Sequence, residues 1–266
     1  MVDLHSHIIP AFDDGCKNLE ESLQMATTQS TDGTVTMIAT PHVENQVDID
    51  KSEEIVDRVA GLNEEIKKAG IRLTVLPGAE LFPCASVIRG LEDQCPLTLA
   101  GTGRYVLFDL PHGSTMPSDF DQTVFGVLAR RITPIFAHPE RSPFFCGNIE
   151  QVESYIERGV VFQVNSGSFI GKHGPHAEDF AFTLFNRRLA QFLASDAHRG
   201  QSRTLGSVAK MLSTPGNEAY VQMLTVESGK AVINGAPLPP RPAPIPEEEK
   251  RPWYSRFTRP FHRHAL

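Results

Sequence analysis

The sequence lacks any run of about 18 apolar residues, the length that a helix needs to cross a bilayer, so we expect no membrane span. Its first residues show no basic segment followed by an apolar one, and we therefore expect no secretory signal. Cysteine is scarce and forms no Cys-x-x-Cys pair; the four are Cys16, Cys84, Cys95 and Cys146. Free thiols in a protein of the reducing cytoplasm are the simplest interpretation.

Positive charge is also in short supply. The 25 Lys and Arg residues are outnumbered by 32 Asp and Glu residues, which gives a net charge of -7. This balance argues against a general nucleic-acid binder, although it leaves room for a local basic pocket. The chain has 266 residues, of which 40% are hydrophobic and 21% are charged. A single soluble α/β domain commonly reaches about 250 residues, so these values fit one such domain.

Apolar, β-rich segments alternate with segments of helical periodicity along the chain. The expected strands are Val2–His7, Thr34–Ala39, Ile71–Leu76, Tyr105–Phe108, Pro134–Ala137, Val160–Val164 and Gln191–Ala194. The expected helices are Leu19–Ser30, Ser52–Lys68, Phe120–Arg131, Ile149–Arg158, Ala177–Arg188, Arg203–Met211 and a further one that ends at Glu227. Such strand–helix repeats predict an α/β fold with a parallel sheet closed, or nearly closed, into a barrel.

Residues that can bind metal ions follow nearly every expected strand. The first strand ends in His5-Ser6-His7, and residues two apart point to the same side of a strand. In a β/α barrel the carboxyl ends of all strands open on one face, so these side chains should converge. Imidazole is the commonest ligand of transition metals in proteins, and carboxylates join it readily. The candidate ligands at strand ends are His5, His7, His42, Glu80, Asp109, His138, Asp196 and His198.

The composition changes after residue 234. The segment that begins at Gly235 is rich in proline, which cannot form regular hydrogen-bonded structure. The chain then ends with arginines interleaved with aromatic residues, from Arg251 to Arg263. We therefore expect one domain over residues 1–234 and a tail over residues 235–266. The basic, aromatic end would suit an anionic membrane surface or a partner, and the alternative is a tail without a specific role.

Six short motifs occur in one order along the chain. They are His5-Ser-His-Ile-Ile-Pro with Asp13-Asp14-Gly15, Ala39-Thr-Pro-His42, Pro77-Gly-Ala-Glu80, Ala137-His-Pro-Glu-Arg141, Gln163-Val-Asn-Ser-Gly-Ser168 and Ala194-Ser-Asp-Ala-His198. In this order they resemble the PHP (polymerase and histidinol phosphatase) superfamily, and within it the CpsB/CapC branch of bacterial manganese-dependent protein tyrosine phosphatases. The resemblance spans roughly residues 1 to 210 and leaves out the tail after Gly235.

The resemblance implies a distorted (β/α)7 barrel of the PHP type that holds three divalent ions, Mn in the first place, with Fe, Zn or Mg as alternatives. The implied ligands are His5, His7, Glu80 and Asp196 for the first ion, Asp14, His42 and His198 for the second, and Glu80 as a bridge with Asp109 and His138 for the third. A mixture of imidazoles and carboxylates suits such metals. These ligands neutralise three dications only in part, so the centre should attract a phosphate group.

Two features of the motifs leave the ligand set open. The family commonly has Glu where this chain has Asp109, whose shorter side chain falls about 1.5 Å short unless the strand moves. We therefore expect the third site to be looser, or to bind its ion through water. Asp13 flanks the same turn at Gly15 as Asp14 does, and it is an alternative second-site ligand.

Two arginines have the spacing of the family's phosphate-binding residues. Arg141 follows His138 by three positions, and Arg203 follows His198 by five. Guanidinium binds phosphate through two parallel hydrogen bonds, which also fix its orientation. Arg199 competes for the role of Arg203, and a surface salt bridge is the structural alternative for each. Glu140 or a bound water would be the proton donor, and Asn165 is a candidate for a supporting hydrogen bond.

The resemblance implies that a metal-bridged hydroxide hydrolyses phosphotyrosine in line, without a covalent phospho-enzyme. The Cys-x5-Arg motif of cysteine-based tyrosine phosphatases is absent, because the residues six positions after the cysteines are Ser22, Gly90, Gly101 and Val152. The implied substrate is a phosphotyrosine protein, in particular a bacterial tyrosine autokinase that controls capsule or exopolysaccharide assembly.

Two other interpretations fit the same residues. One is a PHP phosphatase for a small phosphate ester such as histidinol phosphate, with the same metal centre in a more enclosed pocket. The other is a non-catalytic scaffold that binds a kinase, which Asp109 and the tail favour. In each case we expect a cytoplasmic protein without a nucleic-acid partner, and an oligomer is compatible with the sequence.

Overall fold

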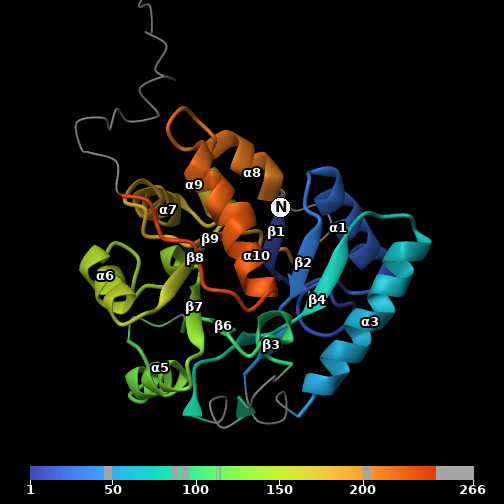
Figure 1. Ribbon diagram of the computed structural model, residues 1–266, viewed down its shortest axis with the longest axis horizontal. Coiled ribbons are helices and arrows are strands. Elements are labelled where there is room, and N and C mark those ends of the chain that lie inside the picture. Colours follow the sequence, from blue (N-terminus) through green and yellow to red (C-terminus); the bar gives the residue numbers. More distant parts are fainter. Residues whose placement is uncertain are drawn as a thin grey trace, which may run out of the picture.

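The computed structural model describes residues 1–44, 50–85, 90–91, 96–111, 113, 115–199 and 205–243. Within these residues, parallel strands alternate with helices (Figure 1). The strands are β1 (Val2–Ser6), β2 (Thr36–Ala39), β3 (His42–Val43), β4 (Thr74–Pro77), β5 (Glu80–Leu81), β6 (Tyr105–Phe108), β7 (Thr133–Ala137), β8 (Val161–Asn165) and β9 (Phe192–Ala194). The α/β class predicted from the sequence is confirmed.

The strands form two parallel sheets, with the orders β1-β2-β4 and β3-β5-β6-β7-β8-β9. Only Thr40 and Pro41 separate β2 from β3, and only Gly78 and Ala79 separate β4 from β5. Each of these pairs therefore continues one line of chain from the first sheet into the second. If each of these pairs is counted once, the nine described strands make seven strand lines, which correspond to the seven expected strands. Among the described residues, however, the strands do not form one continuous sheet.

The first and last lines meet where their strands end. Ser6 forms a parallel bridge with Ala197. The backbone N–H of Asp196 donates to the carbonyl of His5 at 3.0 Å, and that of His7 donates to the carbonyl of Ala197 at 2.9 Å. This contact places the His-x-His segment beside the segment that carries Asp196.

Helices flank the strands on both sides in Figure 1, with α1 and α3 on one side and α5, α6 and α7 on the other. Their bounds are α1 (Leu19–Thr31), α3 (Ser52–Lys68), α5 (Phe120–Ala129), α6 (Ile149–Glu157), α7 (Pro175–Asn186), α8 (Leu205–Leu212), α9 (Glu218–Gln222) and α10 (Ser228–Ile233). The side chain of Asn18 accepts from the N–H of Glu21 and caps α1. No helix in the described part of the chain combines the length and apolar character needed to cross a bilayer.

Apolar side chains of the two sheets pack against one another in the core. One buried cluster takes a residue from each of five strands, namely Leu4, Ile38, Leu107, Ile135 and Phe192. This cluster therefore joins side chains of both sheets, including strands that are not neighbours, in one packed core. A larger cluster lies between the strands and the helices that cover them.

The last helical segment runs further than the sequence predicts. The helix expected to end at Glu227 passes through a π-helical turn, η4 (Met223–Glu227), and continues as α10. Gly229 permits this course, because a Cβ atom there would lie 2.5 Å from the Cβ of Val2 in β1. Residues 236–243 then have no regular structure, as expected for this proline-rich stretch, but Pro239 accepts from Gln191 at 2.9 Å. The basic, aromatic end of the tail lies outside the described residues.

Candidate metal centre

The predicted ligands lie together at the carboxyl ends of the strand lines. Two short elements follow strands at this end, namely η2 (Pro139–Arg141) after β7 and η3 (Ser166–Ile170) after β8. The ligands are placed as follows: His5 in β1, His7 after β1, Asp14 in the following loop, His42 in β3, Glu80 in β5, Asp109 after β6, His138 after β7, and Asp196 and His198 after β9. Residues almost 200 positions apart are thus brought to one place, as the barrel topology predicts.

Four buried side chains form the first group. The Nε2 atoms of His5 and His7 lie 3.3 Å apart, and each lies 3.5 Å from Oδ1 of Asp196. The same nitrogens lie 3.2 and 3.4 Å from Oε2 of Glu80. Two ligand atoms at about 2.1 Å from one ion are about 3.4 Å apart at the tetrahedral angle. The group therefore has the dimensions of a metal site.

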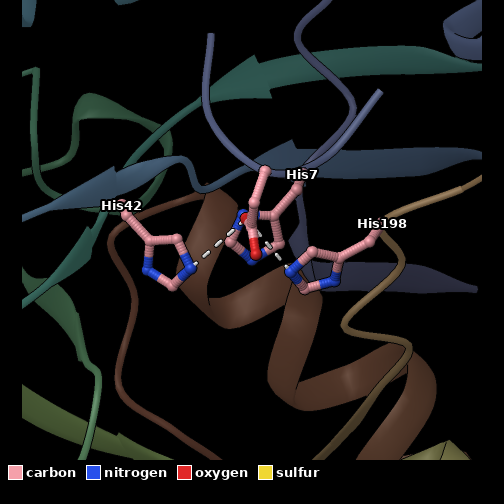
Figure 2. Close-up of side chains that lie close together, drawn as sticks. His7, His42 and His198 are labelled. Atoms are coloured by element: carbon pink, nitrogen blue, oxygen red, sulfur yellow. Dashed lines mark ion pairs between the residues drawn. The ribbon is translucent and has the colours of Figure 1, made fainter. Parts of the chain in front are cut away.

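A second group gathers around Asp14, closer to solvent. Oδ1 of Asp14 lies 3.6 Å from Nε2 of His42 and 3.4 Å from Nε2 of His198. Figure 2 shows the imidazoles of His7, His42 and His198 turned toward one another from separate segments of the chain. The ligand atoms of these four residues lie within 4.8 Å of one another, so His7 joins a group that the sequence assigned to the other three. The Asp14 side chain is 66% exposed, which leaves this group open to an incoming ligand.

The third group consists of His5, Glu80 and His138. Nε2 of His138 lies 3.1 Å from Oε1 of Glu80, whereas Oδ1 of Asp109 lies further away, at 3.8 Å from the same nitrogen. Asp109 therefore lies near His5, Glu80 and His138 but is not one of the three residues whose ligand atoms cluster.

Asp13 and Asp14 are placed differently by the loop that follows β1. Oδ2 of Asp13 lies 2.6 Å from Nδ1 of His7, on the side of the ring away from the first group. Oδ1 of Asp13 accepts from the N–H of Gly15 at 2.9 Å. Gly15 permits the close turn, because a Cβ atom there would lie 2.1 Å from the carbonyl oxygen of His7. The geometry therefore favours Asp14 as the ligand and gives Asp13 a supporting place.

In three of the histidines, Nδ1 faces a hydrogen-bond acceptor outside the group of ligand atoms, so Nε2 is the nitrogen left to bind a metal ion. Nδ1 of His7 faces Asp13, Nδ1 of His5 lies 3.0 Å from Oε1 of Gln163, and Nδ1 of His198 lies 3.1 Å from the carbonyl of Asp196. Such outer acceptors are usual for imidazoles that bind a metal through the other nitrogen. This arrangement, together with the spacing of the inner atoms, fits a resident metal ion.

The charges of the centre also favour a cation. Burial alone would lower the pKa of His5, but the facing carboxylates of Glu80 and Asp196 outweigh it and raise the pKa to about 9. Burial would likewise raise the pKa of Glu80 and of Asp196, but the facing imidazoles hold both well below their usual range. The carboxylates thus stay ionised and need positive charge beside them, which either protons on imidazole or metal ions can supply.

The sequence matches the family described as capsular polysaccharide synthesis, CpsB/CapC, over residues 1–234. The chain belongs to the CpsB/CapC family. It is 33% identical over 203 residues to the tyrosine-protein phosphatase YwqE of Bacillus subtilis strain 168, an alignment that covers 76% of this chain and 79% of YwqE. It is 29% identical over 211 residues to the tyrosine-protein phosphatase CpsB of Streptococcus pneumoniae, covering 76% and 85% of the two chains.

The fold of this CpsB/CapC protein agrees with its sequence relationship. A chain from the crystal structures of YwqE from Bacillus subtilis and CpsB from Streptococcus pneumoniae, described as metal-dependent tyrosine phosphatases, is similar with a TM-score of 0.83. The similarity covers 92% of this chain and all of the other, at 29% identity. The predicted family and the PHP-type fold are thereby confirmed.

The arginines predicted to bind phosphate are Arg141 and Arg203, with Arg199 as the alternative to Arg203. Arg141 of this CpsB/CapC protein lies in η2 and donates through NH1 to Oδ2 of Asp196 at 2.7 Å. Its side chain remains 28% exposed. Arg203 lies outside the described residues, and Arg199 is exposed. Arg141 is therefore the arginine that the described part of the chain brings to the centre.

Glu140 is enclosed rather than open to the centre. Its Oε1 atom accepts from the N–H of Asn165 at 2.9 Å and from the hydroxyl of Ser168 at 2.7 Å. Burial raises the pKa of the Glu140 carboxyl. The side chain is 1% exposed, so it holds β8 and η3 together and is poorly placed to donate a proton to a leaving group.

Two predicted ligands have strained backbone conformations. His138 has a φ of 36° and Asp196 a φ of 50°, in the left-handed region that residues other than glycine rarely adopt. The N–H of His138 donates to the carbonyl of Gln163 at 2.8 Å, which ties the residue to the adjacent strand. Such strain persists only where surrounding contacts enforce it, and it is concentrated at functional sites.

Proposed function

We propose that this protein is a metal-dependent protein tyrosine phosphatase. The observation that carries the proposal is the group formed by His5, His7 and Asp196, whose ligand atoms are 3.3 to 3.5 Å apart. The names of its relatives in the CpsB/CapC family, which are tyrosine-protein phosphatases, support the substrate class.

We further propose three ions, manganese in preference to iron, zinc or magnesium. The first would be held by His5, His7, Glu80 and Asp196; the second by Asp14, His42 and His198; and the third by Glu80, Asp109 and His138. Imidazole and carboxylate donors in this proportion suit borderline and hard divalent metals. When bound, the ions would supply the positive charge that holds a phosphate and activates a water for attack.

The residues around the centre have separate roles in this proposal. Arg141, fixed through NH1 to Asp196, would bind phosphate oxygens with the rest of its guanidinium group. The leaving phenolate has a conjugate acid with a pKa of about 10, so a strong proton donor is not required. The enclosed position of Glu140 is compatible with such a reaction. Arg203 would provide a second contact to the phosphate.

The biological setting is also a proposal. The substrate would be a phosphorylated bacterial tyrosine autokinase, and the reaction would regulate capsule or exopolysaccharide assembly in the cytoplasm. The family description, capsular polysaccharide synthesis, supports this setting. Residues 1–234 would form the phosphatase domain, and residues 235–266 would be an appended tail available for peripheral contact with a membrane or a partner.

A direct assay tests the proposal. The purified protein is given a phosphotyrosine peptide or histidinol phosphate, with Mn²⁺ added or with a chelator. We expect turnover of the peptide with Mn²⁺, loss with chelator or in His7→Ala, and unchanged turnover in Cys146→Ser, whose thiol is free. Turnover of histidinol phosphate alone would instead assign a small-molecule phosphatase. Absence of turnover with any metal would favour a non-catalytic kinase-binding scaffold.

A further inference from the structure

A chain of buried amides links two ligands of the first group on their outer side. Oε1 of Gln163 lies 3.0 Å from Nδ1 of His5, and Nε2 of Gln163 donates to Oδ1 of Asn165 at 2.7 Å. Nδ2 of Asn165 then donates to Oδ2 of Asp196 at 2.7 Å. Gln163 and Asn165 are two residues apart in β8, so both side chains point to the same side of the strand. Both are fully buried.

The direction of this chain is fixed at the Asp196 end. An ionised carboxylate only accepts hydrogen bonds, so Asn165 must present its NH2 group to Asp196. Its carbonyl oxygen then faces Gln163, which must present NH2 in turn. The oxygen of Gln163 is thereby left for His5, whose Nδ1 must carry the hydrogen. Reversing either amide would place two acceptors, or two donors, against each other at a buried position, which costs free energy.

The consequence for His5 is a defined tautomer. With the hydrogen on Nδ1, the lone pair of the neutral ring lies on Nε2, the atom 3.2 Å from Oε2 of Glu80 and 3.5 Å from Oδ1 of Asp196. That is the nitrogen that faces the first group. The alternative tautomer would direct an N–H at a cation.

The chain also assigns the two oxygens of Asp196. Oδ2 accepts from both Asn165 and Arg141 at 2.7 Å. Oδ1 faces His5 and His7 at 3.5 Å and also lies 3.4 Å from Nδ1 of His198. One oxygen is thus held from outside, and the other is left for the centre.

We infer that Gln163 and Asn165 are positioning residues, which transmit the orientation set by Asp196 to His5 and keep both ready to bind the same ion. Glu140 supports them, because it accepts from the N–H of Asn165. This inference rests on the proposed metal site and adds to it two residues that do not themselves bind the ion.

The experiment compares two substitutions of Gln163 in the full chain stripped of metal. Gln163→Leu keeps the approximate shape but removes the acceptor for His5. Gln163→Glu keeps an oxygen for Nδ1–H of His5 and, when protonated, also a donor for Asn165. Titration calorimetry with Mn²⁺ should show an affinity about 10- to 100-fold lower for Gln163→Leu, the usual loss on removing an outer partner. Gln163→Glu should stay close to the wild type.

A packing role for Gln163 predicts the opposite order, because Leu fills the space and a buried carboxylate is costly. Equal losses in the two variants, or a larger loss in Gln163→Glu, would therefore overturn the inference while leaving the metal site intact. Failure of the wild type to bind Mn²⁺ would overturn the proposed function, and this inference with it.

Gln191 provides a matched control. It is also buried and donates to Ser228 at 3.2 Å and to Pro239 at 2.9 Å, but it precedes β9, whereas Asp196 follows it. Gln191→Leu should lower the thermal stability of the metal-free protein without changing its affinity for Mn²⁺. A loss of affinity as large as that of Gln163→Leu would show that the effect is a general one of buried amides.

A measurement on the wild type decides the matter if Gln163→Leu does not fold. In the protein loaded with diamagnetic Zn²⁺, a long-range proton–nitrogen NMR spectrum reports which ring nitrogen of His5 carries the hydrogen. We expect it on Nδ1. A hydrogen on Nε2 would overturn the inference.

Discussion

Nδ1 of His7 lies 2.6 Å from Oδ2 of Asp13, so this carboxylate orients the ring while its neighbour Asp14 faces the second group. Of these two adjacent acidic residues, Asp14 thus lies among the candidate ligands, and Asp13 lies behind one of them. The pKa of Asp13 is lowered although burial would raise it, because His7 beside it outweighs the burial. Asp13 therefore remains an ionised acceptor for the Nδ1–H group of His7.

The first prediction separates these two residues. Asp14→Ala should reduce the number of bound ions by removing a ligand of the second group. Asp13→Ala should keep that number but weaken binding about 10- to 100-fold, since His7 loses its outer acceptor. Elemental analysis after dialysis gives the number, and titration with Mn²⁺ gives the affinity. A full complement of ions in Asp14→Ala, with a missing ion in Asp13→Ala, would show that the roles are reversed.

The second prediction concerns Arg141. Arg141→Ala should lower kcat toward a phosphotyrosine peptide by about 100-fold, the typical loss of one charge-stabilising donor, with unchanged metal content. Arg141→Lys should recover part of the loss, because it keeps the charge without the two-pronged geometry. Arg187→Ala is the control, since Arg187 lies 3.7 Å from Glu153 in an exposed pair. Loss of metal together with activity would mean that Arg141 serves mainly to hold Asp196.

The sequence predicts the convergence of the centre because its determinants are local. A polar residue at the end of an apolar strand can be recognised without coordinates, and barrel topology then places it, as it does for His138 after β7. The two-residue strands β3 and β5, which hold His42 and Glu80, are too short to give a periodic signal. The split of the barrel into two sheets could not be predicted for the same reason.

The hydrogen bonds that hold the ligands from outside, such as those of Asp13 to His7 and of Gln163 to His5, could not be predicted as readily. They depend on the direction in which each side chain points in the folded protein. Asp13 and Asp14 are chemically identical and adjacent, and only the turn at Gly15 decides which one faces inward. Gln163 was missed as a supporting residue. The available signal was a polar residue two positions before Asn165 within an otherwise apolar strand, which predicts that both share one face.

The third prediction is a pH dependence of the metal-free protein. The pKa of His5 is raised to about 9, so its contribution to stability is complete below the unfolded value and is lost as the pH rises toward 9. Glu80 and Asp196 have lowered pKa values, so their contributions are present above their unfolded values of about 4 and are lost as the pH falls. Stability should therefore be greatest between about pH 5 and pH 6.5.

Metal ions should remove the alkaline part of this dependence, because an ion takes the place of the protons on the imidazoles. Thermal unfolding measured across this pH range, with chelator and with Mn²⁺, checks both statements. A melting temperature with chelator that stays constant as the pH rises to about 9 would contradict the coupling of His5 to Glu80 and Asp196.

The fourth prediction concerns Asp109, which lies 3.8 Å from Nε2 of His138, while Glu80 approaches the same atom to 3.1 Å. Asp109→Glu adds one methylene, which moves the carboxylate by about 1.5 Å. The Asp109 side chain is 17% exposed, so the protein does not enclose it on every side and a longer side chain can change its rotamer to approach His138. We expect metal occupancy in Asp109→Glu to equal or exceed that of the wild type. Asp109→Asn, which keeps the length but removes the charge, should lower it. A fall in metal content in Asp109→Glu would show instead that the centre is built around the shorter side chain.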